Sequence, residues 1–164
     1  SDANQMYILA EAEENNNVMG VALVLQAYGY SVLTDIFGNI PFSEAMTADE
    51  GNFTPAYDSQ EAVYAGVLGL LDQAMALLGT GGTIDATSDI LYQGDVQNWK
   101  RFAASLKFRS LMRVSGKMSV GSELESLISS GLLFTDNSQE AKLIYLSSAP
   151  SANPLYESIV FGTR

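Results

Sequence analysis

The stretch from Gly94 to Arg113, GDVQNWKRFAASLKFRSLMR, decides how the rest of this chain is interpreted. It contains the only tryptophan of the chain and five of its eight basic residues. Residues that recur three or four positions apart share one face of an α-helix. In this stretch they are Trp99, Phe102, Leu106, Ser110 and Arg113. The spacing therefore predicts one helix with a large aromatic ring near its start and an arginine near its end.

Charged residues mark both ends of this predicted helix. Asp95 precedes the periodic run and carries the short acceptor side chain that caps helix N-termini. Arg109 and Arg113 fall in the C-terminal half, where the helix dipole favours cations. We expect the apolar face to pack against the preceding helix. We expect the arginines to bind carboxylates, for which the candidates are Asp35, Asp72 and Glu11.

The composition excludes several classes of function. The 164 residues include 8 basic and 19 acidic side chains, for a net charge of −11, which argues against binding nucleic acid or anionic lipid through charge. Cysteine and histidine are both absent from the sequence. This excludes disulfides, thiolate chemistry, Cys/His zinc sites and histidine-based catalytic triads. The hydrophobic fraction of 47% supports one domain with a real core, over residues 1–164.

The most apolar region, from Val18 to Ile40, is long enough to be considered as a membrane span. Polar residues such as Gln26 and Asp35, together with three glycines, interrupt it. A span of about 20 residues needs a more uniformly apolar run. We therefore interpret this region as a buried helix followed by a loop.

Periodicity and turn signals predict an all-α fold of about five helices joined by long ordered loops. Besides the tryptophan helix, the expected helices are Ala3 to Glu14, Met19 to Thr34, Asp58 to Leu78, and a short one that Gly131 ends. We expect two antiparallel pairs, as in solenoid repeats. Little or no β-sheet is expected, because Lys142 to Leu146 is an extended segment without a visible partner.

Capping motifs and turn residues indicate where the helices begin and where the loops lie. Asp58 with Glu61, and Ser122 with Glu125, have the spacing of capping boxes. The stretch from Asp35 to Phe42 contains Gly38-Asn39 and Pro41, and we expect an apolar loop there. A last apolar run spans Leu155 to Phe161.

Several stretches also resemble the conserved phrases of one protein family, in the same order. They are Asp35–Ala45 (DIFGNIPFSEA), Pro55–Tyr64 (PAYDSQEAVY), Leu71–Ala74 (LDQA), Asp89–Arg109 (DILYQGDVQNWKRFAASLKFR) and Ala152–Leu155 (ANPL). This set resembles the SusD/RagB-type outer-membrane glycan-binding lipoproteins. One departure is Ala104, where that family usually has asparagine. The ordered set covers roughly Asp35 to Arg164.

The resemblance implies a fold and a function. It implies TPR-like helix pairs, in a chain that is a fragment of a protein some three times longer with an export signal and a lipid-anchoring cysteine. It implies a non-catalytic, surface-exposed lipoprotein of the outer membrane that captures glycans in a polysaccharide-utilisation system. Its expected partners are an oligosaccharide and a SusC-like TonB-dependent transporter, with the membrane reached only through the lipid anchor. For this fragment alone, it implies weak or absent glycan binding.

Sugar binding requires aromatic faces beside polar groups. The candidate ligand-binding residues are Phe37, Asn39, Phe42 and Tyr57, with Tyr92 as a further possibility. The alternative is that these side chains anchor loops on the core, which is the more common role of loop aromatics. The residues Asp95, Trp99, Phe102, Leu106, Arg109 and Arg113 are interpreted instead as the structural signature of the scaffold.

Other chemistries have weaker signals. Asp85, Asp89 and Asp95 are oxygen ligands, but their spacing does not fit an EF-hand, so no metal and no cofactor are expected. Glu123 and Glu125 resemble a glycosidase pair only superficially, since a capping box accounts for them. We therefore expect a binding protein rather than an enzyme. The alternative function is a TPR-like adaptor for a protein or peptide partner.

Overall fold

The computed structural model describes residues 2–47, 51–146, 152–156 and 159. The helices are α1 (Asp2–Ala12), α2 (Asn16–Phe37), α3 (Gln60–Leu77), α4 (Val96–Val114), α5 (Gly121–Ser129), the 3-10 turn η2 (Asn137–Gln139) and the short α6 (Pro154–Tyr156). Over these residues the only β-type pairings are two isolated bridges, Ile40 with Asp58 and Leu146 with Ala152. The predicted all-α fold is confirmed.

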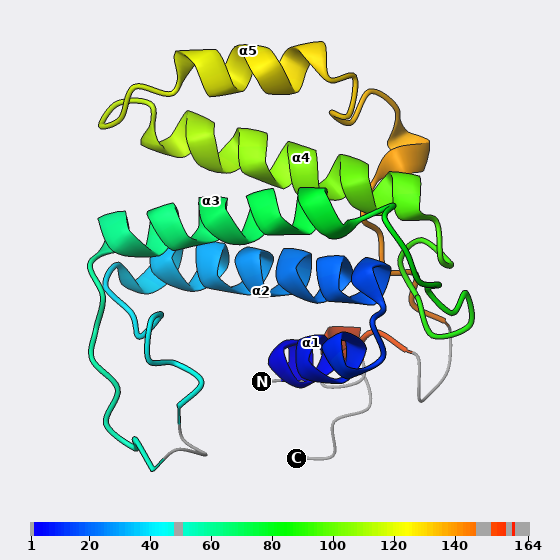
Figure 1. Cartoon of the computed structure of the whole chain (residues 1–164), viewed down its shortest axis with the longest axis horizontal. Helices are drawn as coiled ribbons and strands as arrows, with labels where there is room; N and C mark the ends of the chain where they lie inside the picture. The colour runs from blue at the N-terminus through cyan, green and yellow to red at the C-terminus, as the bar shows by residue number, and fades with distance from the viewer. Residues whose placement is uncertain (1, 48–50, 147–151, 157–158, 160–164) are drawn as a thin grey trace.

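The helices from α2 to α5 lie side by side, and each runs antiparallel to the one before it (Figure 1). Helix α1 packs against α2 on the side away from α3. Both predicted pairs, α1 with α2 and α3 with α4, are present, but the most extensive packing joins α2 to α3. Connected antiparallel helices place the C-termini of α2 and α4 beside the N-terminus of α3 (Figure 1).

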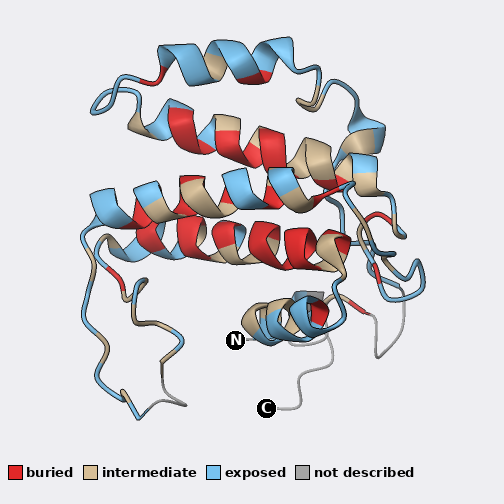
Figure 2. Ribbon diagram, in the orientation of Figure 1, coloured by how far each residue is buried: buried red, intermediate tan, exposed pale blue. Residues whose placement is uncertain are grey.

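The buried residues form one main core and one smaller core. The main core contains Val24 of α2, Leu71 of α3, and Trp99 and Leu106 of α4. The smaller core lies under α5 and contains Leu68, Ala104, Leu111, Val120 and Leu127. Figure 2 shows the buried positions gathered along the middle helices. Helix α4 therefore contributes to both cores, whereas the periodicity of its sequence predicted only the one face that packs against α3.

Helix α2 is long and apolar enough to cross a membrane by length and composition alone. In the structure it lies between α1 and α3, where Val24 and Ala27 are fully buried. It begins at Asn16 and ends at Phe37, so it is longer than the predicted Met19 to Thr34. The expectation that Phe37 lies in a loop is wrong, because the helix continues until Gly38, where φ is +74°.

Three consecutive asparagines at the start of α2 hold the glycine-rich loop after α3. Buried Asn17 donates from Nδ2 to Gly82 O at 2.8 Å, and its Oδ1 accepts from the Gly79 amide at 2.6 Å. Asn15 donates to Thr83 O at 2.9 Å, and Asn16 donates to the Thr80 hydroxyl at 3.0 Å. We call Asn15, Asn16 and Asn17 the asparagine clamp.

Two predicted helix caps are misplaced, the first by one residue and the second by two. The N-cap of α3 is Ser59, whose hydroxyl accepts from the Ala62 amide, and not Asp58. Asp58 pairs with Ile40 in an extended bridge, which turns its carboxylate away from the helix. Helix α5 begins at Gly121, so Ser122 lies inside its first turn and α5 has no side-chain cap.

The C-terminal part contains little regular structure over the described residues. Lys142 to Leu146, predicted to be a strand or an extended segment, forms no helix or named strand, and only Leu146 takes part in a bridge. The predicted apolar run from Leu155 to Phe161 lies largely outside the described residues.

Candidate functional site

The start of α4 carries the predicted cap and the tryptophan. Asp95 Oδ1 accepts from the amides of Gln97 at 2.8 Å and Asn98 at 3.1 Å, which confirms Asp95 as the N-cap. The Trp99 side chain is only 2% exposed, and its Nε1 donates to Asp89 Oδ2 at 2.8 Å. Trp99 therefore belongs to the scaffold and offers no surface for stacking a sugar.

Asp89 organises the loop that leads into α4. Its carboxylate accepts from the amides of Leu91, Tyr92 and Gly94, in addition to the indole of Trp99. Burial alone would raise the pKa of Asp89, but these hydrogen bonds outweigh it and lower the pKa. The carboxylate is therefore held in its charged form by four donors that point at it.

The remaining residues of this region are also used in local contacts. Tyr92, a possible ligand residue, is buried, with its ring edge-on to Trp99 at 5.3 Å. Asp85 accepts from the amide and hydroxyl of Thr87. No group of three acidic side chains is arranged for a metal in the part of the chain that the structure describes. We call this region, residues 79–99 with the asparagine clamp, the tryptophan end.

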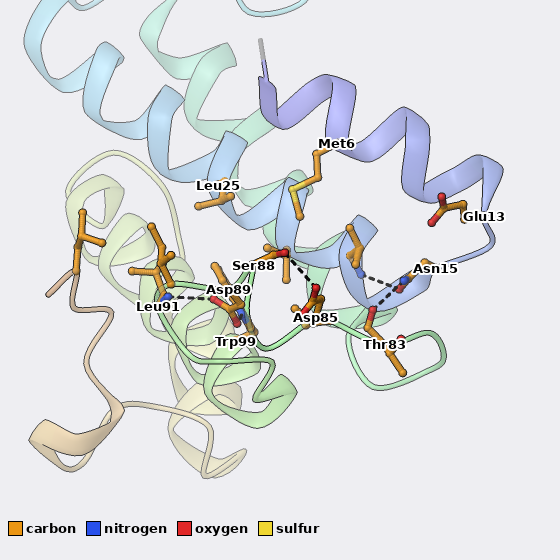
Figure 3. Close-up of a pocket in the computed structure, with 15 residues that line it drawn as sticks. Met6, Glu13, Asn15, Leu25, Thr83, Asp85, Ser88, Asp89, Leu91 and Trp99 are labelled. Carbon is orange, nitrogen blue, oxygen red and sulfur yellow. Dashed lines mark hydrogen bonds between the residues drawn. The ribbon is translucent and has the colours of Figure 1, made fainter. Parts of the chain in front are cut away.

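A cavity of about 570 Å³ opens at the tryptophan end between α1, α2 and the loop after α3 (Figure 3). Its walls are mainly apolar and include Met6, Val21, Leu25, Ile84, Leu91 and Trp99. Several of the labelled polar groups bond to their neighbours: Ser88 donates to Asp85, and Asn15 donates to Thr83, whereas Glu13 is drawn without a hydrogen bond (Figure 3). The bonded groups have few free hydrogen-bonding positions for sugar hydroxyls.

Helix α4 contacts α2 through a pair of aromatic rings, a cation–π contact and one ion pair. Phe102 lies 6.3 Å from the Tyr28 ring and 6.3 Å from the Phe134 ring. The predicted pairing of Arg113 with Asp35 is confirmed, at 2.5 Å. Among the described residues Arg109 has no carboxylate partner, and it lies over the Tyr28 ring, 5.9 Å from its centre.

Lys107, rather than an arginine, binds the candidate carboxylate of Asp72. Lys107 is buried and binds Asp72 at 2.6 Å and Glu123 at 3.2 Å. Asp72 was expected to pair with an arginine, but Lys107 projects toward it instead. Glu123, the glycosidase-like residue, is an ion-pair partner of the same lysine.

The four predicted ligand-binding residues lie at or after the end of α2 and separate into two kinds. Phe37 and Tyr57 are 69% and 73% exposed. Phe42 packs edge-on against Tyr30, at 4.7 Å, and lies over Gly66. Asn39 accepts from the Gln60 amide at 3.1 Å, which joins the loop to the start of α3. Two side chains are thus free to meet a ligand, while two hold the loop in place.

Two carboxylates fix the loop that carries these residues. Asp58 Oδ2 accepts from the amides of Phe42 and Ser43, and Glu44 Oε2 accepts from the Ala56 amide and from Asn52. The hydrogen bonds from backbone amides lower the pKa of both carboxyl groups. The loop is therefore held at several points, although it lies outside the helical layer (Figure 1).

Phe53 is a candidate that the sequence patterns did not reveal. Its side chain is 81% exposed, on the same loop as Tyr57. The two residues on either side of Phe53 are Gly51, Asn52, Thr54 and Pro55, so no apolar periodicity marks this ring in the sequence. The loop and the last turn of α2 therefore present three exposed aromatic rings.

A second cavity, of about 720 Å³, lies where α2 and α4 end and α3 begins. Its polar lining consists of Asp35, Gln60, Glu61, Tyr64, Arg113 and Lys117. Asp35 accepts from the Tyr64 hydroxyl and from Arg113. Burial, followed by the neighbouring Asp35 carboxylate, raises the pKa of Tyr64, so the phenol keeps its proton. We call the region of these six residues the arginine end.

The loop after α2 and the arginine end are connected through Gln60. Its amide donates to Asn39, and its side chain donates to Thr34 O at 2.7 Å while lining the cavity. The structure therefore joins the predicted loop residues to a polar cavity that the sequence did not reveal.

Comparison with known proteins gives a consistent set of relatives. A SusD-like family model, described as "Starch-binding associating with outer membrane", matches residues 1–164. A putative outer-membrane protein from Bacteroides vulgatus, "probably involved in nutrient binding", is 34% identical, with a TM-score of 0.76 over 84% of this chain and 31% of its own. No curated protein matches the chain.

Two further solved structures cover nearly the whole chain. A SusD homolog from Bacteroides uniformis is 27% identical, with a TM-score of 0.83 over 97% of this chain and 33% of its own. A chitin-binding SusD homolog from Flavobacterium johnsoniae is 28% identical, with a TM-score of 0.77 over 95% of this chain and 34% of its own. The chain thus spans about a third of the length of these structures.

Proposed function

The chain belongs to the SusD-like family, and on that premise we propose that it is the helical portion of a longer, non-catalytic protein that captures a glycan or a related nutrient. The family model associates its members with the outer membrane and with starch binding. One relative is named for chitin binding. Capture of a carbohydrate at the outer membrane is therefore the function that the relatives support best.

The three exposed aromatic rings, on the last turn of α2 and on the pinned loop that follows it, are the observation that carries this proposal. Phe37, Phe53 and Tyr57 expose between 69% and 81% of their surface. Exposed aromatic rings whose apolar surface the fold does not bury are candidates for a binding surface. Sugar rings present C–H faces that stack on aromatic faces, while their hydroxyls need polar partners. The adjoining arginine end supplies such partners. Asn39 and Phe42 stay predictions as direct ligand contacts.

Affinity electrophoresis of the whole protein tests the proposal. The gels contain soluble starch, glycol chitin or polygalacturonate, and we expect retardation by at least one of them. The double variant Phe37→Ala with Tyr57→Ala should be retarded less. The variant Tyr145→Ala is the matched control, because Tyr145 is 46% exposed and lies outside the loop. Absence of retardation in all gels, or release of reducing sugar by the protein, would contradict the proposal.

We further propose that the whole protein is a surface lipoprotein that cooperates with a TonB-dependent outer-membrane transporter of the SusC type. The acidic surface, with a net charge of −11, would serve as the protein contact. Affinity purification from outer membranes in mild detergent should recover the transporter. The alternative function, a TPR-like adaptor, predicts a co-purifying partner together with no retardation by any polysaccharide.

A further inference from the structure

Free positive charge in this acidic chain is concentrated along one line of α4. Six of the eight basic residues lie between positions 100 and 117. Three of these six have close polar partners, since Lys107 binds Asp72 and Glu123, Arg101 donates to Gly131 O, and Arg113 binds Asp35 through one nitrogen. Arg109, Arg113 and Lys117 follow at intervals of four positions, which places them on one side of the helix and of the turn that closes it.

Lys117 has hydrogen-bonding capacity that the fold does not use. Its side chain is exposed, lines the cavity at the arginine end, and has no polar partner in the part of the chain that the structure describes. Arg113 uses Nη1 to bind Asp35, and a guanidinium has five N–H donors in all. The helix dipole favours cations at the end of α4 but does not occupy these donors.

The acidic groups of the cavity leave the free N–H donors of Lys117 and Arg113 available to a ligand. Asp35 is occupied by Tyr64 and Arg113. Glu61, in the first turn of α3, is exposed and has no side-chain partner among the described residues. A carboxylate without a partner accepts hydrogen bonds from hydroxyl groups. The cavity thus combines cationic donors for an anion with an acceptor for hydroxyls.

We propose that the arginine end binds the carboxylate of a uronic acid residue in an acidic glycan. Lys117 and the free donors of Arg113 contact the carboxylate, and Glu61 with Gln60 binds neighbouring hydroxyls. This inference rests on the proposed function and narrows the substrate to a class of carboxylate-bearing sugars. In a chain with a net charge of −11, such a ligand needs a local concentration of cations, and α4 provides it.

Calorimetric titration of the whole protein with oligosaccharides tests this assignment. The probes are trigalacturonate, trimannuronate and maltotriose, at low and at moderate salt. We expect one of the uronates to bind at least about tenfold more tightly than maltotriose, and its binding to weaken as salt is added. Lys117→Gln should weaken that binding about tenfold or more, because a hydrogen bond to a charged group is lost.

Two further variants separate a specific contact from a change of net charge. Lys117→Arg keeps the charge and should keep most of the affinity. Lys142→Gln removes the same charge at an exposed lysine that pairs with Glu140, outside the arginine end, and should leave the affinity unchanged. Equal losses in Lys117→Gln and Lys142→Gln would overturn the assignment.

The outcomes also distinguish this inference from the proposed function. Binding of maltotriose or retardation by starch or glycol chitin, without binding of either uronate, overturns the acidic-sugar assignment and leaves glycan capture intact. Binding of no oligosaccharide, together with no retardation in any gel, overturns both.

Discussion

The two ends of the helical layer differ in how completely their polar groups are satisfied. At the tryptophan end, Asp89 receives four hydrogen bonds and buried Asn17 makes two more across the bundle. At the arginine end, Lys117 and Glu61 have no side-chain partners among the described residues, and Phe37 is largely exposed. The first arrangement stabilises the fold, whereas the second leaves groups available for a ligand.

Removal of the tryptophan should produce the largest loss of stability. Trp99→Ala should lower the free energy of unfolding by about 3–5 kcal/mol, because a buried aromatic side chain is replaced by a cavity. Phe37→Ala is the matched control at the other end, and it should change the free energy of unfolding by less than about 0.5 kcal/mol. Urea denaturation of both variants and of the parent measures the difference in the free energy of unfolding. Equal midpoints for Trp99→Ala and the parent would show that the ring is not a core residue.

Neutralising Asp89 should lower the free energy of unfolding by less than Trp99→Ala does. It should also change how the stability of the protein depends on pH. Asp89→Asn should lower the free energy of unfolding by about 2 kcal/mol at pH 7, since hydrogen bonds to a charged acceptor are weakened. Asp95→Asn is the matched control with a near-zero cost, because asparagine caps helices as well as aspartate does.

The acid response follows from the lowered pKa of Asp89 in the folded protein. The stability that the carboxylate contributes is fully present above its unfolded-state pKa of about 3.9 and is lost as the pH falls through the lower folded-state pKa. The parent should therefore lose more stability than Asp89→Asn between about pH 5 and pH 3. Denaturation curves across this range measure the difference, and parallel curves would contradict it.

Breaking the ion pair at the arginine end should have the smallest effect on stability. Arg113→Gln should change the free energy of unfolding by less than about 1 kcal/mol, because half of the Arg113 side chain is exposed and Asp35 keeps Tyr64. Lys107→Gln, on the same helix, should cost more, since it leaves Asp72 and Glu123 without their buried cation. If Arg113→Gln costs as much as Lys107→Gln, the arginine end is part of the stabilising framework and the contrast between the ends fails.

Local and periodic signals predicted much of the tryptophan end. The cap at Asp95 and the burial of Trp99 depend on neighbours within one or two helical turns, so the sequence pattern is sufficient for both. The asparagine clamp was not predicted, because its partners lie more than 60 positions away and the same residues also suit a simple turn. The cap of α3 was misplaced by one residue since Asp58 and Ser59 are both good caps.

Only single residues and one contact of the arginine end could be predicted from the sequence. The pairing of Arg113 with Asp35 was one of several open choices, and only the packing of α4 beside α2 decides among them. The contact of Arg109 with Tyr28 depends on the same packing. A cavity formed where three helix ends meet has no signature in any one segment. Phe37 and Tyr57 were recognisable by residue type, but their exposure was not.

The asparagine clamp also has a consequence for how the chain folds. Its hydrogen bonds join residues 62 to 68 positions apart. A contact of such high sequence separation carries a large loop-closure entropy unless intervening structure has already brought its ends together. The antiparallel docking of α2 on α3 does this, because it returns the chain to the start of α2. We therefore expect the clamp to form late, after the helical hairpin of α2 and α3 is complete, and we expect the Gly79 amide that donates to Asn17 to exchange with solvent mainly when that hairpin opens.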